Sequence, residues 1–301
     1  MLILAIDIGG TTAKMGLLRE DGTILARQEV SVCFDHYETP VLNTVSAAAA
    51  GFLVKQEASV SGVAVSATGQ IDTALGIVAG TNGKIPNYEG SPIKERLEKQ
   101  FGVPVWVLND ANAAALGECF LGAGKGSRNV LMVTLGTGVG GGLVLDGRVY
   151  GGSRGFAGEL GHFTLYQDGT PCACGKRGCY ENYASTTALL RKSGAANGKE
   201  LFARVRAGDA QAREALDAWL DDVAAGLTGL IHIFNPQLVL VGGGISVQEE
   251  LLIEPLRRKV LAGVMPRFAE GLKLERAVLG NDAGMIGALR FWLDREQACS
   301  A

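Results

Sequence analysis

Short apolar runs alternate with longer stretches of helical periodicity along this chain. The short runs predict buried strands at residues 2–8, 13–18, 60–66, 103–108, 129–135 and 237–241. Apolar positions three and four residues apart predict helices at 39–57, 91–101, 111–121 and 209–234. The glycine-punctuated stretch 69–88 predicts a loop. Strands that alternate with helices in this way are typical of an α/β architecture.

One arrangement occurs twice in the sequence. Residues 2–18 and 129–150 each combine an apolar strand, a turn rich in glycine and threonine, a second apolar strand and an Asp-Gly hairpin signal. In the second copy, the strand after the turn is predicted at 143–150. A chain of 301 residues has room for about two domains of roughly 100–200 residues each. The repeat therefore predicts two domains of similar build.

Composition and charge exclude several classes of protein. An apolar fraction of 47% with only 20% charged residues excludes a disordered chain, although 43 residues are glycine. A net charge of −3 without a basic run argues against nucleic acid or an anionic membrane as partner. The N-terminus lacks the features of a secretory signal, and no apolar run reaches about 18 residues. We therefore expect a cytoplasmic protein that acts on small molecules.

The first glycine-rich turn, Gly9-Gly10-Thr11-Thr12, follows a strand that also carries Asp7. Backbone N–H groups that are not shielded by side chains, together with two hydroxyl groups, are what a bound phosphate requires. Asp7 could hold Mg²⁺ beside it. On this segment alone, a plain hairpin turn explains the sequence equally well.

The second turn, at residues 135–142, matches the G-x-G-x-x-G pattern through Gly136, Gly138 and Gly141. A dinucleotide site is excluded because strand rather than helix is predicted to follow, and a Walker loop is absent at residues 124–126. Paired strand-turn-strand phosphate clamps are instead found in actin-like, sugar-kinase and Hsp70-type ATPases. The third cluster, residues 242–244, resembles their adenosine-contacting loop.

Asn109-Asp110 stands where a buried strand gives way to a helix, the place where α/β proteins put reactive side chains. Phosphoryl transfer to an alcohol needs a carboxylate that can accept the proton of the attacking hydroxyl. Asp110 is the candidate for this general base. The alternative is that Asp110 only caps the helix that follows.

Four residues of metal-ligand type lie within a stretch of 18: His162, Cys172, Cys174 and Cys179. Three cysteines and one histidine predict a tetrahedral zinc site of structural type, against the alternative of unligated buried cysteines. The second ring nitrogen of His162 could then be oriented toward a substrate hydroxyl. Glu159 and Glu181 flank the same stretch, as acceptors for sugar hydroxyls or as solvated loop carboxylates.

These motifs, in order, resemble those of the ROK family of bacterial sugar kinases and related repressors, from residue 2 to about 290. The resemblance implies an actin-like ATPase (ribonuclease H-like) fold with a cleft between two α/β lobes. The lobes would cover residues 1–117 with a C-terminal helix at about 287–301, and residues 118–286. The implied cofactors are ATP, Mg²⁺ and structural Zn²⁺, the last held by the four residues named above.

The resemblance also assigns roles by position. Asp110 would be the catalytic base. The implied sugar-binding residues are Gly69, Gln70, Asn82, Asn109, Asp110, Glu159, His162 and Glu181. The implied ATP-binding residues are Asp7, Gly9, Gly10, Thr11, Thr12, Thr137, Gly138, Gly243 and Gly244.

The expected activity is transfer of a phosphoryl group from ATP to the 6-hydroxyl of a hexose, either glucose or an N-acetylhexosamine such as N-acetylmannosamine. Departures from the family pattern at Thr68-Gly69 and at 83–88 lie on the sugar side, so a β-glucoside kinase is an alternative. A sugar-sensing ROK regulator without kinase activity and a non-sugar ATPase are alternatives of other classes. The family resemblance suggests a homodimer or homotetramer.

Overall fold

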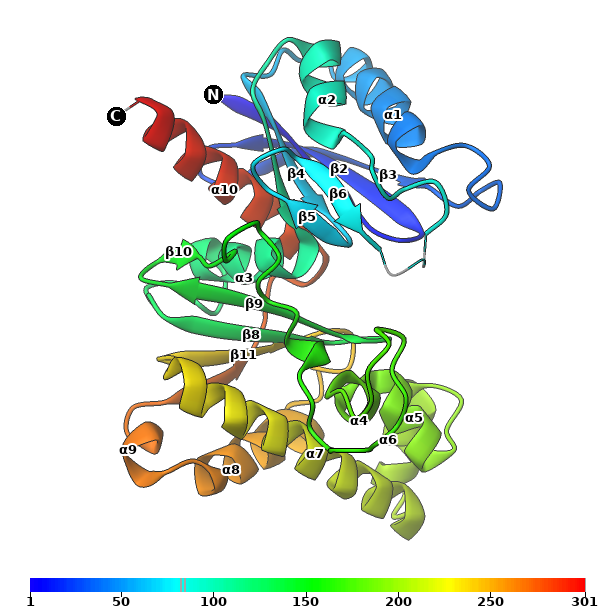
Figure 1. Ribbon diagram of the computed structural model, residues 1–301, viewed down its shortest axis with the longest axis vertical. Helices are drawn as coiled ribbons and strands as arrows, with labels where there is room; N and C mark the ends of the chain where they lie inside the picture. Colours follow the sequence, from blue (N-terminus) through cyan, green and yellow to red (C-terminus); the bar gives the residue numbers. More distant parts are fainter. Residues whose placement is uncertain (82, 84, 301) are drawn as a thin grey trace. The chain divides into compact units, whose positions relative to one another are not determined.

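The computed structural model describes residues 1–81, 83 and 85–300. The chain divides into two compact units (Figure 1). Unit 1 comprises Met1–Lys125, Val149–Ala157 and Asn281–Ala301, and unit 2 comprises Gly126–Arg148 and Gly158–Gly280. Each unit contains its own five-stranded sheet and its own apolar core.

The sheet of unit 1 has the strand order β3-β2-β1-β4-β7. Strand β1 is antiparallel to β2 and parallel to β4, which is in turn parallel to β7. Every residue of β4 is buried, as expected for a strand covered on both faces. The strands are β1 (Leu2–Ile8), β2 (Thr12–Arg19), β3 (Ile24–Ser31), β4 (Gly62–Ala67) and β7 (Val105–Asn109).

Helices cover both faces of this sheet. Alternation along β1 turns Leu4, Ile6 and Ile8 into the core that includes helices α1 (Val41–Lys55) and α2 (Ile93–Phe101). The opposite face meets α10 (Ala283–Ser300), which also packs against α3 (Asp110–Leu121). This alternation places Asp7 on the α10 face.

A short antiparallel hairpin interrupts the segment predicted to be a loop. Strands β5 (Gln70–Asp72) and β6 (Ile77–Gly80) pair with each other, with a register irregularity at Gln70/Ile71. The loop prediction at 69–88 was therefore wrong for these residues. Strands of three and four residues are too short to show a hydrophobic period.

The sheet of unit 2 repeats the arrangement of the first, with the order β10-β9-β8-β11-β12. Strand β8 is antiparallel to β9 and parallel to β11, which is parallel to β12. The strands are β8 (Val130–Leu135), β9 (Val139–Leu145), β10 (Arg148–Val149), β11 (Leu238–Gly242) and β12 (Lys273–Arg276). Strand β9 begins four residues before the predicted position, because Gly140–Gly142 continue the ladder with β8.

The helices of unit 2 pack around α7 (Ala210–Phe234), whose buried side chains include Trp219, Val223 and Leu227. The others are α4 (Glu181–Ala184), α5 (Thr186–Ser193), α6 (Gly198–Arg206), α8 (Glu254–Gly263) and α9 (Pro266–Ala269), with a π-helical turn at Glu249–Ile253 and 3-10 turns at Leu160–His162 and Gly280–Asp282. Among the described residues, no helix is both long and apolar enough to cross a membrane.

Helices α3 and α10 approach each other through glycine. A Cβ atom at Gly287 would collide with the carbonyl oxygen of Ala113, and one at Gly117 would collide with that of Ala283. Backbone cannot yield as a flexible side chain can, so we expect Gly287→Ala to destabilise the protein by about 1–3 kcal/mol.

Gly51→Ala is the matched control, because nothing lies within 4 Å of a Cβ atom at this position of α1. The control should raise stability by about 0.5–1 kcal/mol, since alanine favours the helix. Thermal unfolding followed by circular dichroism measures both variants. A Gly287→Ala protein as stable as wild type would contradict close backbone packing of the two helices.

Candidate functional site

Three parallel strands of unit 1 end at the same level. Ile8 of β1 pairs with Ala67 of β4, which pairs with Asn109 of β7. The residues that follow each strand are therefore neighbours at one edge of the sheet. This edge is where open α/β sheets bind their ligands, and it brings together the predicted residues Gly9, Gly69, Asn109 and Asp110.

The turn from Gly9 to Thr12 joins β1 to β2 and is held by one hydrogen bond within the turn and by two from other segments. Gly9 N donates to Thr12 O at 2.9 Å, and Val32 N donates to Thr11 O at 2.9 Å. The Tyr37 hydroxyl donates to Gly10 O at 2.7 Å. The turn thus has a fixed backbone, with the Thr11 side of the turn exposed.

Asp7 is a largely buried carboxylate below this turn. Its Oδ1 accepts a hydrogen bond from the Ser66 hydroxyl at 2.7 Å, and Lys14 Nζ lies 4.0 Å from Oδ2. Gly284 lies against the carboxylate in the first turn of α10, where the helix dipole favours negative charge. Burial raises the pKa of Asp7, while Ser66 and Lys14 oppose the rise.

Asn109, not Asp110, caps α3. The Asn109 side chain accepts from Asn112 N at 3.1 Å, and Asp110 is the first helical residue. The alternative that Asp110 is only a cap is therefore wrong. Asn109 Nδ2 donates to Asp110 Oδ1 and to Gly69 O, both at 2.9 Å, and Ala111 N donates to the same Asp110 oxygen at 2.8 Å. These bonds fix the plane of the Asp110 carboxylate.

Tyr88 is a buried polar residue beside these carboxylates that sequence reasoning missed. Its side chain is fully buried, and its hydroxyl has no hydrogen-bond partner within the part of the chain that the structure describes. Burial and the nearby charges of Asp110 and Asp7 raise the pKa of Tyr88 above its ordinary value. Only the departure from the family pattern at 83–88 marked this segment.

Gly69 and Gln70, two of the predicted sugar residues of unit 1, lie at the start of the β5–β6 hairpin. Gly69 has a φ of +95°, a conformation that favours glycine, and the Gln70 side chain lies next to Gly80. The predicted residue Asn82 lies outside the described residues.

In unit 2, two turns meet at one edge of the second sheet. Gly136 N donates to Gly138 O at 3.0 Å in the turn that joins β8 to β9. Thr134 of β8 pairs with Gly242 at the end of β11, and Gly243, with a φ of +95°, packs directly on the backbone of Leu135. The structure therefore gathers the predicted residues Thr137, Gly138, Gly243 and Gly244.

Glu181 lies against the same turn. Its Oε2 accepts from Val139 N at 3.0 Å and lies against Gly138, where a Cβ atom would displace the carboxylate. No sequence pattern indicates this contact, which joins a predicted sugar-binding residue to a predicted ATP-binding one.

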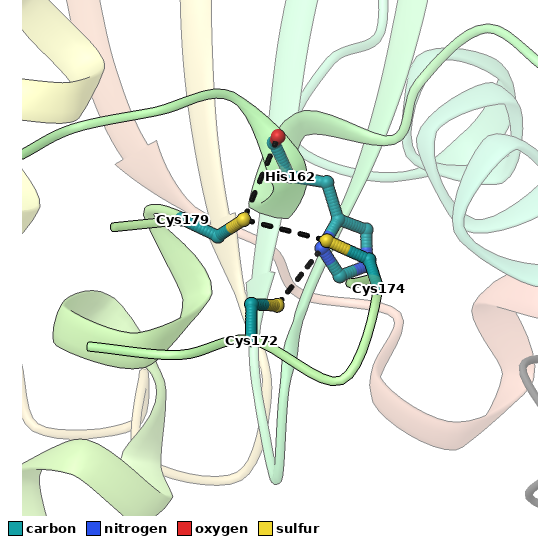
Figure 2. A group of neighbouring side chains, drawn as sticks. All are labelled: His162, Cys172, Cys174 and Cys179. Carbon is teal, nitrogen blue, oxygen red and sulfur yellow. Dashed lines mark hydrogen bonds between the residues drawn. The ribbon is translucent and has the colours of Figure 1, made fainter. Parts of the chain in front are cut away.

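The four predicted metal ligands form one cluster in unit 2, with all ligand atoms within 4.8 Å of one another (Figure 2). Cys172 Sγ lies 3.6 Å from His162 Nδ1, and Cys174 Sγ lies 3.5 Å from Cys179 Sγ. Zinc–sulfur bonds of about 2.3 Å in a tetrahedron separate ligands by about 3.8 Å, so the cluster fits this metal.

The orientation of His162 suits two roles, as a metal ligand through one ring nitrogen and as a sugar contact through the other. Its Nδ1 faces the cysteines, while its Nε2 lies 3.9 Å from Glu159 Oε2. The ring is thus placed between the candidate metal position and a predicted sugar-binding carboxylate. Both residues belong to the turn at 159–162 that packs next to β9.

Two sheets of the same topology, each with a glycine turn after its central strand, define the class of protein: it has the actin-like ATPase fold, as predicted. The chain belongs to the ROK family, whose model, described as ROK family, matches residues 3–295. This confirms the resemblance seen in the motifs.

Relatives include both enzymes and regulators. The chain is 36% identical to a glucokinase of Thermotoga maritima over 305 residues, covering 95% of each. A solved structure of a ROK family glucokinase from Streptomyces griseus, in complex with glucose and AMPPNP, is 32% identical with a TM-score of 0.80, covering 97% of this chain and 99% of that one. A xylose repressor of Bacillus subtilis is 31% identical over 237 residues, covering 77% of this chain and 61% of the repressor. The glucokinase relatives support a sugar kinase.

Proposed function

We propose that this protein transfers the γ-phosphoryl group of ATP to the 6-hydroxyl of a hexose, either glucose or an N-acetylhexosamine. The observation that carries the proposal is the Asp110 carboxylate, held at the end of β7 by the N–H of Ala111 and the amide of Asn109. A fixed carboxylate beside a phosphate-type turn is the group that phosphoryl transfer to an alcohol requires.

Asp110 accepts the proton of the sugar hydroxyl as that oxygen attacks phosphorus. The bonds to one carboxylate oxygen set the orientation of the group before substrate arrives, which reduces the entropic cost of reaction. Both donors of the Asn109 amide and one acceptor site of its oxygen are already engaged, so its main role is to position Asp110.

Each unit offers a glycine turn with the groups that nucleotide phosphates require, namely backbone N–H groups and hydroxyls. These residues are Gly9, Gly10, Thr11 and Thr12 in unit 1 and Thr137 and Gly138 in unit 2. Gly243 and Gly244, in the third glycine cluster, are assigned to the adenosine part of ATP. Asp7 would hold Mg²⁺, directly or through water, and the ion neutralises phosphate charge when bound. A bound cation would also offset the unfavourable burial of the Asp7 carboxylate.

In unit 2, sugar hydroxyls donate to the carboxylates of Glu159 and Glu181 and bond to Nε2 of His162. The family resemblance also assigns a sugar-binding role to Gly69, Gln70 and Asn82. His162, Cys172, Cys174 and Cys179 would hold zinc, whose function is to fix the ring of His162 and the loop that carries the cysteines. A β-glucoside fits the same chemistry, so the sugar has to be identified by assay.

A sugar-sensing regulator is the second candidate, because repressors share the family. The kinase is favoured because the glucokinase match covers nearly all of both chains, whereas the repressor match covers 61% of that protein.

A screen of hexoses by coupled ADP release tests the proposed function. With Mg²⁺-ATP, we expect one or more of glucose, N-acetylglucosamine, N-acetylmannosamine, mannose and cellobiose to raise ADP release at least about tenfold above the sugar-free rate. Phosphorus NMR should place the new phosphate on the 6-oxygen. ADP release that no sugar stimulates would favour a different ATPase, and hexose binding without turnover would favour the regulator.

Metal analysis tests the zinc site. Purified protein should contain about one zinc ion per chain, and Cys174→Ser should lose most of it and unfold at a lower temperature. Cys299→Ser is the control, since Cys299 is exposed and outside the cluster. Full zinc content in Cys174→Ser, or metal-free wild type that unfolds at the same temperature, would contradict the assignment.

A further inference from the structure

A short segment at residues 181–187, which we name the turn clamp, makes four hydrogen bonds to the β8–β9 turn at 135–139. Besides the bond from Val139 N to Glu181 Oε2, Thr186 N donates to Gly136 O at 2.9 Å and the Thr186 hydroxyl donates to Leu135 O at 3.0 Å. The Thr187 hydroxyl donates to Thr137 O at 2.9 Å. Clamp and turn both lie in unit 2.

The turn needs these hydrogen bonds because its own residues do not restrict its backbone to one conformation. Glycine at 136 and 138 gives the backbone more conformational freedom than any other residue would, and ordering it costs free energy. A loop that is already ordered binds its ligand more tightly, because that cost is met before binding. The bonds from the clamp supply this order from about 50 residues away in the sequence.

The clamp is itself anchored to the core of unit 2. Tyr180, directly before it, is fully buried, and its hydroxyl donates to Val223 O of α7 at 2.8 Å. Trp219 of α7 also donates, through Nε1, to the carbonyl oxygen of Ser185 in the clamp at 3.1 Å. The Ser185 hydroxyl accepts from Ala188 N and so caps α5. Helix α7 therefore holds the clamp in place, and the clamp holds the turn.

We propose that the turn clamp keeps the 135–139 turn in its nucleotide-binding conformation and that Glu181 couples this effect to the sugar. The inference rests on the proposed function, in which sugar hydroxyls bond to Glu181. Glu181 Oε2 accepts the hydrogen bond from Val139 N. Among the described residues, no donor bonds to Glu181 Oε1, so this oxygen can accept a hydrogen bond from a sugar hydroxyl. A sugar bound there restricts the Glu181 side chain and so strengthens its hold on the turn.

Thermodynamic linkage makes the effect reciprocal, so bound sugar should tighten nucleotide binding and bound nucleotide should tighten sugar binding by the same factor. Thr186 and Thr187 are positioning residues in this scheme. They act on nucleotide affinity through the turn and have no contact with sugar.

Calorimetric titration of the sugar-free protein with AMP-PNP and Mg²⁺ tests the clamp. Thr187→Val keeps the shape of the side chain but removes the hydroxyl, and should weaken nucleotide binding roughly five- to tenfold. Thr187→Ser restores the hydroxyl and should bind within about twofold of wild type. Thr187 is exposed, so neither change should unfold the protein. Unchanged affinity in Thr187→Val, or equal weakening in both variants, would overturn the clamp.

The same titration with and without saturating glucose or N-acetylmannosamine tests the coupling. In wild type, sugar should lower the Kd for AMP-PNP at least about fivefold. In Glu181→Gln, this ratio should fall below about twofold, because the charge that the turn and the sugar share is gone. Glu159→Gln is the matched control: it should weaken sugar binding but keep the wild-type ratio at saturation, since among the described residues the Glu159 carboxylate pairs with His162 and makes no hydrogen bond to the turn.

A wild-type ratio in Glu181→Gln, or a ratio near one in wild type, would overturn the coupling. Failure of the proposed function looks different and is measured by the ADP-release screen, in which no sugar would stimulate turnover. If wild type also binds neither glucose nor N-acetylmannosamine nor any other hexose, there is no sugar for Glu181 to couple to the turn. In that case the coupling falls as well, while the two Thr187 variants still decide whether the clamp orders the turn.

Discussion

The parallel register of strands is the constraint on which the rest of the structure depends. Because β1, β4 and β7 end level with one another, Gly9, Gly69 and Asp110 become neighbours at one edge of the first sheet. The Asn109 amide then bonds both Gly69 and Asp110. The second sheet repeats the device, since the pairing of Thr134 with Gly242 brings Gly243 onto the backbone of Leu135. The same strand topology therefore places the glycine turns of each unit at one edge of that unit's sheet.

Glycine serves two different purposes in this arrangement. At Gly138, Gly243 and Gly284, a Cβ atom would displace a neighbouring carboxylate or backbone, so glycine permits close approach at the candidate site. At Gly117 and Gly287 it permits two helices to pack backbone against backbone. At these five positions, glycine thus allows close contacts, both at the candidate site and between the helices of unit 1.

Features that are local in the sequence could be predicted, and features that depend on tertiary contacts could not. The strands at 2–8 and 129–135, the glycine turns that follow them and the spacing of the cysteines all have local signals, and the family match confirms the fold. The helix cap was assigned to Asp110 in one interpretation, because Asn and Asp are both good caps and only the geometry distinguishes them. The contact of Thr187 with Thr137 and the burial of Tyr88 arise between distant segments and leave no pattern in the sequence.

The central claim is that Asp110 acts as the general base of a hexose kinase, and a single-turnover measurement on Asp110→Asn tests it most directly. Asparagine keeps the size of the side chain but cannot accept the proton, so the rate of phosphoryl transfer should fall roughly 10²–10⁴-fold. Binding of sugar and of AMP-PNP should stay within about threefold of wild type, because the fold and the turns are unchanged. A near wild-type rate of transfer in Asp110→Asn, with the sugar bound normally, would contradict the account.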